Sequence, residues 1–197
     1  MLMIDLFSGL GGASEAFVNH PDWNVIRVEL ESSCSHVAHT IIGDVNDDHL
    51  IRSLPSNADI LWMSPPCTEF STARQPPIEN PSLELVERCL EIIEILKPKH
   101  WVIENVKGAI KHLDRLLGLP SVIIGGTYVL WGNFPKFTAN IEGHSKFNKD
   151  PWSSDPLRAQ KRAYVPIKIS EALRQSLQYQ TKLDQYSVKV KSQRSTK

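Results

Sequence analysis

A cysteine in a proline-bounded segment is the first position in this sequence that could do covalent chemistry. Cys67 lies in residues 64–71 (SPPCTEFS), directly after the apolar run 60–63. Two prolines stop a strand and fix the backbone, so the segment predicts a rigid loop that presents the thiol. A thiolate there is a strong nucleophile once its pKa is lowered. A small buried thiol is the alternative, and we prefer that alternative only for Cys89, on the apolar face of a predicted helix.

A carboxylate stands at the end of another apolar run. Glu104 follows residues 100–103 and precedes Asn105 and Val106. Burying a carboxylate without a partner is costly, so a role in a cleft is favoured over a packing role. Capping of the next loop is the alternative.

A glycine-rich turn near the amino terminus could bind a nucleotide-like cofactor. Residues 5–12 (DLFSGLGG) read as a strand that enters a turn and then a helix. Glycines let a ligand approach the backbone, and the helix start offers unpaired N–H groups. Glu29, about 20 residues further on, could hold ribose hydroxyls. Asp44 could accept a hydrogen bond from an adenine amine, although the glycine turn alone could also be a tight connection.

Alternating elements must position these residues. Their order predicts an α/β fold with an open, mostly parallel sheet and crossover helices. Gly125 and Gly126 predict a tight hairpin that adds an antiparallel pair at one edge. The predicted strands are 3–7, 24–30, 60–63, 100–106, 121–124 and 127–131; the predicted helices are 11–19, 85–96 and 169–177; residues 140–162 read as a loop or lid.

Composition sets the remaining limits. The 197 residues and 41% hydrophobic content predict one domain, residues 1–180, followed by a basic, disordered tail, residues 181–197. Lys+Arg and Asp+Glu are both 22, so there is no global basic field and any nucleic-acid contact must be local. The start does not resemble a secretory signal, and no apolar run approaches the roughly 20 residues that span a bilayer.

The three cysteines form neither an even framework nor a C-x-x-C pair, which favours a reducing, cytoplasmic setting. Cys34, His36 and His39 supply only three candidate metal ligands with no second cluster nearby, so we expect no metal and prefer a helix start rich in carboxylates for this region.

The three chemical segments, in this order and spacing, resemble the signature blocks of the cytosine-5 DNA methyltransferase family. The resemblance runs from residue 3 to about residue 106 and implies a Rossmann-like class I methyltransferase fold. It implies that S-adenosyl-L-methionine is the cofactor. The implied cofactor-binding residues are Asp5, Phe7, Ser8, Gly9, Gly11, Gly12, Glu29, Leu30, Asp44, Val45 and Pro65.

The same resemblance implies that Cys67 is the nucleophile and that Glu104 grips the cytosine edge. Carbon 5 of cytosine becomes nucleophilic only after something adds to carbon 6, and a Cys67 thiolate can add there if ring nitrogen 3 gains a proton from Glu104. A base within a duplex must be flipped out first. The implied substrate-binding residues are Pro66, Ser71, Arg74, Asn105 and Arg162.

Several positions depart from the family pattern. Thr68 stands where the family usually has Gln, and Gly125-Gly126 falls near its Gln-x-Arg block, so Arg74, Arg158 or Arg162 would have to substitute. Ala163-Tyr164 replaces the Gly-Asn of the final cofactor-closing block, which residues 164–167 (YVPI) otherwise resemble.

The segment 140–162 is also too short for a target-recognition domain. Its basic residues could contact phosphates, which position a nucleic acid without specifying its sequence. These residues are His144, Lys146, Lys149, Arg158, Lys161 and Arg162. We therefore expect loose target choice, or a protein partner that supplies recognition. DNA is the favoured substrate, and RNA or transfer RNA is the alternative; a non-catalytic, cofactor-binding regulatory subunit is the alternative from another class.

Overall fold

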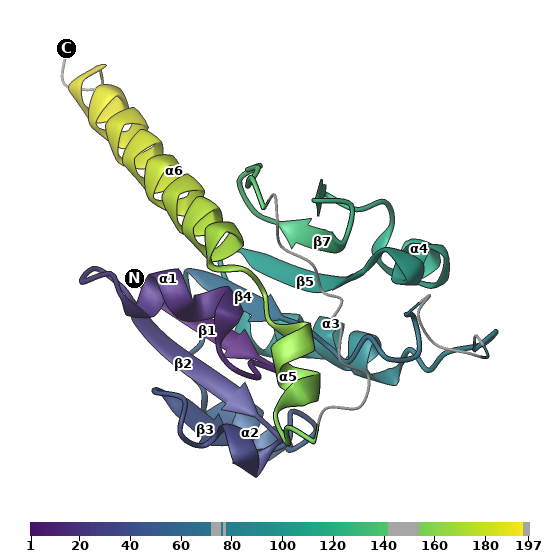
Figure 1. The fold of residues 1–197 in the computed structure, drawn as a ribbon. Helices are drawn as coiled ribbons and strands as arrows, with labels where there is room; N and C mark the ends of the chain where they lie inside the picture. Colours follow the sequence, from purple (N-terminus) through teal and green to yellow (C-terminus); the bar gives the residue numbers. More distant parts are fainter. Residues whose placement is uncertain (72–75, 77, 142–153, 195–197) are drawn as a thin grey trace.

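A seven-stranded sheet forms the centre of the computed structural model, which describes residues 1–71, 76, 78–141 and 154–194, with side chains described to residue 184 and at 186 (Figure 1). The strand order is β3-β2-β1-β4-β5-β7-β6. Strands β1 to β5 are parallel, whereas β7 runs antiparallel to both β5 and β6. The strands are β1 (Leu2–Leu6), β2 (Asn24–Glu29), β3 (Thr40–Ile42), β4 (Ile60–Met63), β5 (Trp101–Val106), β6 (Val122–Ile124) and β7 (Tyr128–Asn133). The α/β prediction of a mostly parallel, Rossmann-like sheet with an antiparallel edge is confirmed.

Helices cover both faces of this sheet (Figure 1). One face carries α1 (Glu15–Val18) and α6 (Ile167–Arg194), and the other carries α2 (Asp48–Ser53) and α3 (Glu84–Leu96). The remaining elements are α4 (Ile110–Leu117), α5 (Arg158–Ala163) and the 3-10 turns η1 (Gly12–Ser14), η2 (Ser32–Cys34) and η3 (Lys107–Ala109).

Strand β4 shows how the sheet builds two cores at once. All four of its residues are buried: Ile60 and Trp62 pack on the side of α1 and α6, whereas Leu61 and Met63 pack on the side of α3. Successive side chains of a strand point to opposite faces, so a strand covered on both sides must be apolar throughout. Cys89 of α3 is fully buried in the second core, as its helical spacing predicted.

The hairpin between β6 and β7 is the one predicted from Gly125-Gly126. The two glycines have φ of 56° and 67°, the backbone of a type I′ turn. The Thr127 N–H donates to the Ile124 carbonyl at 3.2 Å and closes the turn.

The carboxy-terminal segment differs from its prediction. Helix α6 continues through Arg194, so the described part of the expected disordered tail is helical. Its first half is docked on the sheet through Ile169, Leu173 and Leu177, which removes the cost of nucleating a helix. Residues 178–194 contain neither Gly nor Pro, so the docked helix can propagate (Figure 1). The boundary of the domain at residue 180 stays a prediction.

Three shorter elements also differ. The predicted helix 11–19 divides into η1 and α1, and the expected helix start near Cys34 is only the turn η2. Part of the predicted loop or lid 140–162 is helical, as α5, while residues 142–153 lie outside the described chain.

Gly132 offers a test of the sheet edge. Its φ is 146°, and a Cβ there would run into the Trp101 backbone carbonyl of the paired strand β5. Gly132→Ala should lower the free energy of unfolding by about 2 to 4 kcal/mol, measured by urea denaturation. Gly43→Ala is the control, because its Cβ would meet only the end of the flexible Leu50 side chain. Equal losses in the two variants would contradict this account of the edge.

Candidate active site

From β1, the strand order runs through β2 to β3 on one side and through β4 to β5 on the other, so the order of the parallel strands switches between β1 and β4. A pocket lies at the carboxyl ends of these two strands. Sheets of this kind bind ligands at the carboxyl edge of such a switch point. The turn after β1, the loop after β4 and Glu104 of β5 line one pocket, which contains about 540 Å³ of empty space counted out to solvent.

The turn after β1 has an unusual backbone. Phe7 has φ of 57°, a left-handed conformation that bulky residues rarely adopt, and Gly9 and Gly11 follow with φ of 50° and 77°. The Gly11 N–H donates to the Ser8 carbonyl at 2.7 Å, and the Gly9 N–H donates to Glu29 Oε2 at 2.7 Å. Strain of this kind persists only where surrounding contacts hold it.

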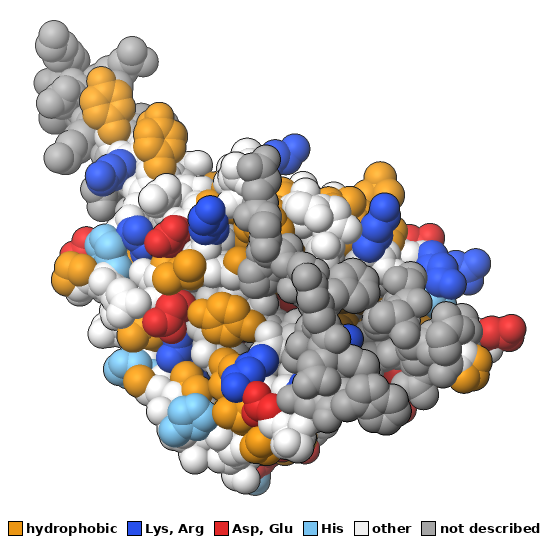
Figure 2. Space-filling view, viewed as in Figure 1, with side chains coloured by type: hydrophobic (Ala, Val, Ile, Leu, Met, Phe, Trp, Pro, Cys, Tyr) orange, Lys and Arg blue, Asp and Glu red, His pale blue; other side chains and the backbone are white. Residues whose placement is uncertain are grey.

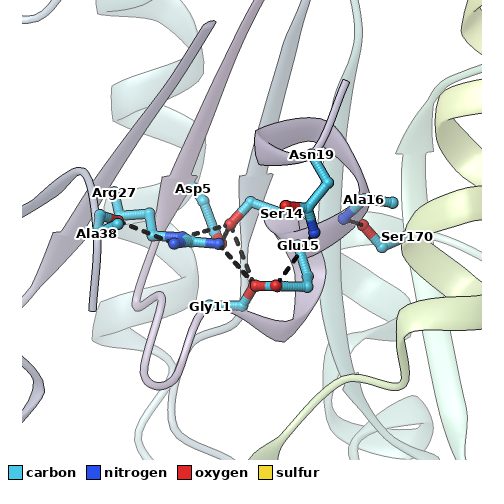
Figure 3. A network of polar contacts seen from close by, with 9 residues as sticks. All are labelled: Asp5, Gly11, Ser14, Glu15, Ala16, Asn19, Arg27, Ala38 and Ser170. Carbon is cyan, nitrogen blue, oxygen red and sulfur yellow. Dashed lines mark hydrogen bonds and ion pairs between the residues drawn. The ribbon is translucent and has the colours of Figure 1, made fainter. Parts of the chain in front are cut away.

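A buried arginine supplies those contacts (Figure 3). Arg27 of β2 is 2% exposed. Its Nε donates to Ser14 Oγ at 2.7 Å, its Nη2 to the Gly11 carbonyl at 3.1 Å and its Nη1 to the Ala38 carbonyl at 2.9 Å. Ser14 Oγ in turn donates to Asp5 Oδ2 at 2.6 Å. The guanidinium therefore connects the glycine turn, the start of the first helix and the end of β1.

Asp5 has an unusually high pKa for a carboxyl group. Burial raises its pKa to about 7, although the hydrogen bond from Ser14 and the nearby Arg27 charge act in the opposite direction. Its second oxygen, Oδ1, is buried without a hydrogen-bond partner, and so are Ser8 Oγ and Gln160 Oε1. All three residues line the pocket. Orphaned buried polar atoms are costly, so their gathering in one pocket indicates a polar ligand that would satisfy them.

The loop that carries Cys67 is held from several sides. Trp62 Nε1 donates to Ser64 Oγ at 2.7 Å, and Asn105 Nδ2 donates to the Pro65 carbonyl at 3.1 Å. Phe70, 6% exposed, packs into a cluster with Leu113 of α4. The rigid loop predicted from the prolines is therefore tied to β4, β5 and α4.

Glu104 is 5% exposed and lines the pocket together with Cys67. Tyr128 is also buried. Its burial and the negative charge of the nearby Glu104 raise the pKa of the tyrosine. Tyr128 stays protonated and donates to the Tyr164 carbonyl at 3.3 Å.

Ala163, Tyr164 and Val165 line the pocket beside the glycine turn. A Cβ on Gly12 would run into the Val165 carbonyl, so this close packing requires glycine. Several lining residues were not among the predicted site residues. These are Leu10, Ala13, Ser64, Gln160, Ala163, Tyr164 and Val165. Leu10 and Ser64 lie within the segments 5–12 and 64–71, and residues 163–165 lie in the segment that resembles the closing block, whereas Ala13 and Gln160 carried no signal.

The structure thus brings together part of the predicted site. Asp5, Phe7, Ser8, Gly9, Gly12, Pro65, Pro66, Cys67 and Glu104 line the pocket. The others described lie outside its lining: Gly11, Glu29, Leu30, Asp44, Val45, Ser71, Asn105 and Arg162. Arg74 lies outside the described residues.

Most of the predicted site residues outside the pocket lining are either exposed, packed in the core or engaged in hydrogen bonds with the backbone. Leu30 is 63% exposed, whereas Val45 is buried in the core beside α2 and α3. Asn105 is 1% exposed and both ends of its amide are engaged, because Oδ1 accepts from the Val106 N–H at 2.9 Å. Glu29 bonds to the glycine turn, Asp44 Oδ1 accepts from the Asn46 N–H at 2.8 Å, and Arg162 is exposed on α5.

No three His, Cys, Asp or Glu side chains of the described ranges are grouped to hold a metal ion. Within those same ranges, no helix combines the length and hydropathy needed to cross a membrane.

A methyltransferase family model matches the first part of the sequence. Residues 1–118 match the family model described as C-5 cytosine-specific DNA methylase. The match covers more than half of the chain, which therefore belongs to the C-5 cytosine-specific DNA methylases, as the three signature blocks indicated.

Individual relatives agree with this family. A probable DNA (cytosine-5)-methyltransferase of Frog virus 3 is 32% identical over 120 residues, 53% of each chain. The type II methyltransferase M.XorII of Xanthomonas oryzae is 30% identical over 119 residues, 53% of this chain and 28% of that protein. M.HindV of Haemophilus influenzae is 24% identical over 197 residues, 90% of this chain and 63% of that protein. The match spans about half the length of the first of these relatives and about a quarter of the second.

A solved structure, the methyltransferase EhMeth of Entamoeba histolytica, superposes with a TM-score of 0.45 at 17% identity and covers 68% of this chain and 52% of that chain.

The Arg27 network makes a stability prediction. Arg27→Met should lower the free energy of unfolding by about 3 to 5 kcal/mol, because it leaves buried acceptors and Asp5 without their cation. Arg52→Met, at an exposed position of α2, is the control and should change stability by less than about 0.5 kcal/mol. Urea unfolding of both variants measures the difference. A small effect at Arg27 would show that the turn does not depend on this network.

Proposed function

We propose that this chain transfers a methyl group from S-adenosyl-L-methionine to carbon 5 of cytosine in DNA through a covalent Cys67 adduct. The observation that carries the proposal is the shared pocket: the thiol of Cys67 and the carboxylate of Glu104 line the same cavity as the glycine turn after β1. Membership of the C-5 cytosine-specific DNA methylase family supports the same reaction.

The pocket residues fit the proposed cofactor. S-Adenosyl-L-methionine supplies an electrophilic methyl group on a sulfonium, and it also carries an ammonium and ribose hydroxyls that need acceptors. The unpartnered Asp5 Oδ1 and Ser8 Oγ offer acceptors at the buried end of the pocket. Glu29 remains the proposed ribose anchor: its carboxylate accepts from Gly9 and Glu31 N–H groups, yet a carboxylate has room for further hydrogen bonds.

The chain's own residues would then perform the chemistry on the base. Cys67 adds through its thiolate sulfur to carbon 6 of cytosine while Glu104 donates a proton to ring nitrogen 3. The electron pair that this addition places on carbon 5 forms the new bond to the methyl group, whose bond to the sulfonium sulfur breaks and leaves a neutral thioether. A water molecule accepts the carbon 5 proton, the electron pair of that bond expels Cys67 as a thiolate and restores the aromatic ring, and nitrogen 3 returns its proton to Glu104.

Target recognition is proposed to be loose or delegated to a protein partner. The turn near the family's Gln-x-Arg block is closed by Gly125 and Gly126, which present no side chain to a base. M.XorII is also longer than this chain, since one match covers 53% of this chain and only 28% of that protein. The same two observations favour the second candidate, a cofactor-binding subunit without catalysis of its own. DNA is preferred over RNA because the relatives named above are called DNA or type II methyltransferases.

The covalent step can be trapped. With S-adenosyl-L-methionine and a DNA duplex that contains 5-fluorocytosine, the chain should form a complex that survives denaturing electrophoresis, because fluorine cannot leave as a proton does. Cys67→Ser should abolish the complex, whereas Cys89→Ser, at the buried thiol of α3, should retain it. Absence of the complex in a chain that binds cofactor would favour the non-catalytic subunit.

Cofactor binding should depend on pH through Asp5. The raised pKa of about 7 leaves this carboxyl mostly neutral at pH 5.5 and half ionised at pH 7. Only the ionised form pairs with the cofactor ammonium, whose own pKa lies higher, so affinity should rise roughly tenfold over this range. Calorimetry at pH 5.5, 6.2 and 7 measures it.

Asp5→Asn is the matched control, because the amide can keep the contact with Ser14 but cannot ionise. Its affinity should be weak and should not change over the same pH range. A pH dependence that is identical in the variant and the wild type would assign the titration to another group.

A further inference from the structure

Three basic side chains form a row on the outer face of the helix that follows β5. Lys107 begins η3, and Lys111 and Arg115 follow on α4 at intervals of four residues; all three are exposed. Ala109 and Leu113, on the opposite face, are fully buried. Four residues of helix advance about 6 Å, so the row extends over roughly 12 Å.

Within the described part of the chain, these three cations belong to the basic side chains that form no ion pair. Arg27, Arg88, Lys99 and Lys161 each form an ion pair, whereas the described residues form none with the row. Asp114 is the carboxylate next to the row on α4, and its Oδ1 accepts from the backbone N–H of Arg115. Blue side chains gather over α4 in the space-filling view (Figure 2). In a chain with no net charge, this row is a local positive surface.

The row starts beside the candidate active site. Lys107 follows directly on β5, the strand that carries Glu104. Further along, the ring of His112 lies 5.9 Å from the ring of Phe70, which belongs to the Cys67 loop. A polymer whose base enters the pocket would therefore pass close to α4.

We propose that Lys107, Lys111 and Arg115 bind the phosphates of the DNA strand next to the target cytosine. This inference rests on the proposed function and adds a surface outside the segment 140–162, where the sequence placed the phosphate contacts. Lysine and arginine at exposed positions contact phosphate oxygens without reading bases. The surface thus positions the strand and leaves sequence choice to other elements.

Salt dependence tests this surface quantitatively. Each phosphate contact contributes about 0.9 to the slope of log affinity against log salt concentration. The triple variant Lys107→Gln, Lys111→Gln, Arg115→Gln should bind a fluorescent cytosine-containing duplex more weakly, with a slope shallower by roughly 2 to 3, and equally so for unrelated sequences. Fluorescence anisotropy between 50 and 300 mM KCl measures the slope.

A second triple variant removes the same charge elsewhere. Arg52→Gln, Lys97→Gln and Lys182→Gln change exposed positions outside the pocket lining and should leave the slope near that of the wild type. Calorimetry with S-adenosyl-L-methionine checks that both triple variants keep the pocket intact.

The outcomes separate this inference from the proposed function. Wild-type binding with an unchanged slope in the α4 variant would overturn the α4 surface and leave the proposed reaction standing. Equal losses in both triple variants would also overturn it, since they would show a diffuse charge effect. No DNA binding by the wild type would overturn the DNA substrate and the α4 surface together.

Discussion

The hydrogen bonds of one buried guanidinium determine where the glycine turn lies. Arg27 cannot lose its charge, so each donor buried with it needs an acceptor, and the Gly11 carbonyl and Ser14 Oγ provide two of them. A Cβ on Gly11 would come within 2.5 Å of the guanidinium carbon. The turn therefore packs directly against a cation, and Glu29 accepts a hydrogen bond from its Gly9 N–H.

Two segments that lie far apart in the sequence meet at this turn. Gly12 packs against the backbone of Val165, and the Ala16 N–H donates to Ser170 Oγ at 3.1 Å. The side of the pocket next to the glycine turn is thus closed by a segment about 150 residues away in sequence. The side that carries Cys67 is built separately, since Asn105 and Trp62 hold the Cys67 loop through Pro65 and Ser64. The two sides share the carboxyl edge of β1, β4 and β5, which places the Cys67 loop and the glycine turn in one pocket.

Local patterns were enough to predict most of the sheet and to single out Cys67 and Glu104, which line one pocket. Continuous apolar runs predicted β4 and β5, because strands covered on both faces must be apolar at every position. Gly125-Gly126 predicted the hairpin, because only that backbone allows two successive positive φ angles at little cost. Cys67 and Glu104 stood out for a related reason. Cys67 follows the buried strand β4, and Glu104 lies in the second half of β5, where a polar or reactive group is costly to bury without a partner.

The sequence by itself thus determined the family, the sheet and the residues at the ends of β1, β4 and β5, since these depend on neighbours along the chain. Only the tertiary structure decided the burial of Arg27, the raised pKa of Asp5, the hydrogen bond from Asn105 to the Cys67 loop and the length of the helix α6. Leu30 and Val45, adjacent to site residues in sequence, lie outside the pocket lining for the same reason. Desolvation and hydrogen-bond partners come from segments far apart in the chain, and no local pattern of residue types records which segments those are.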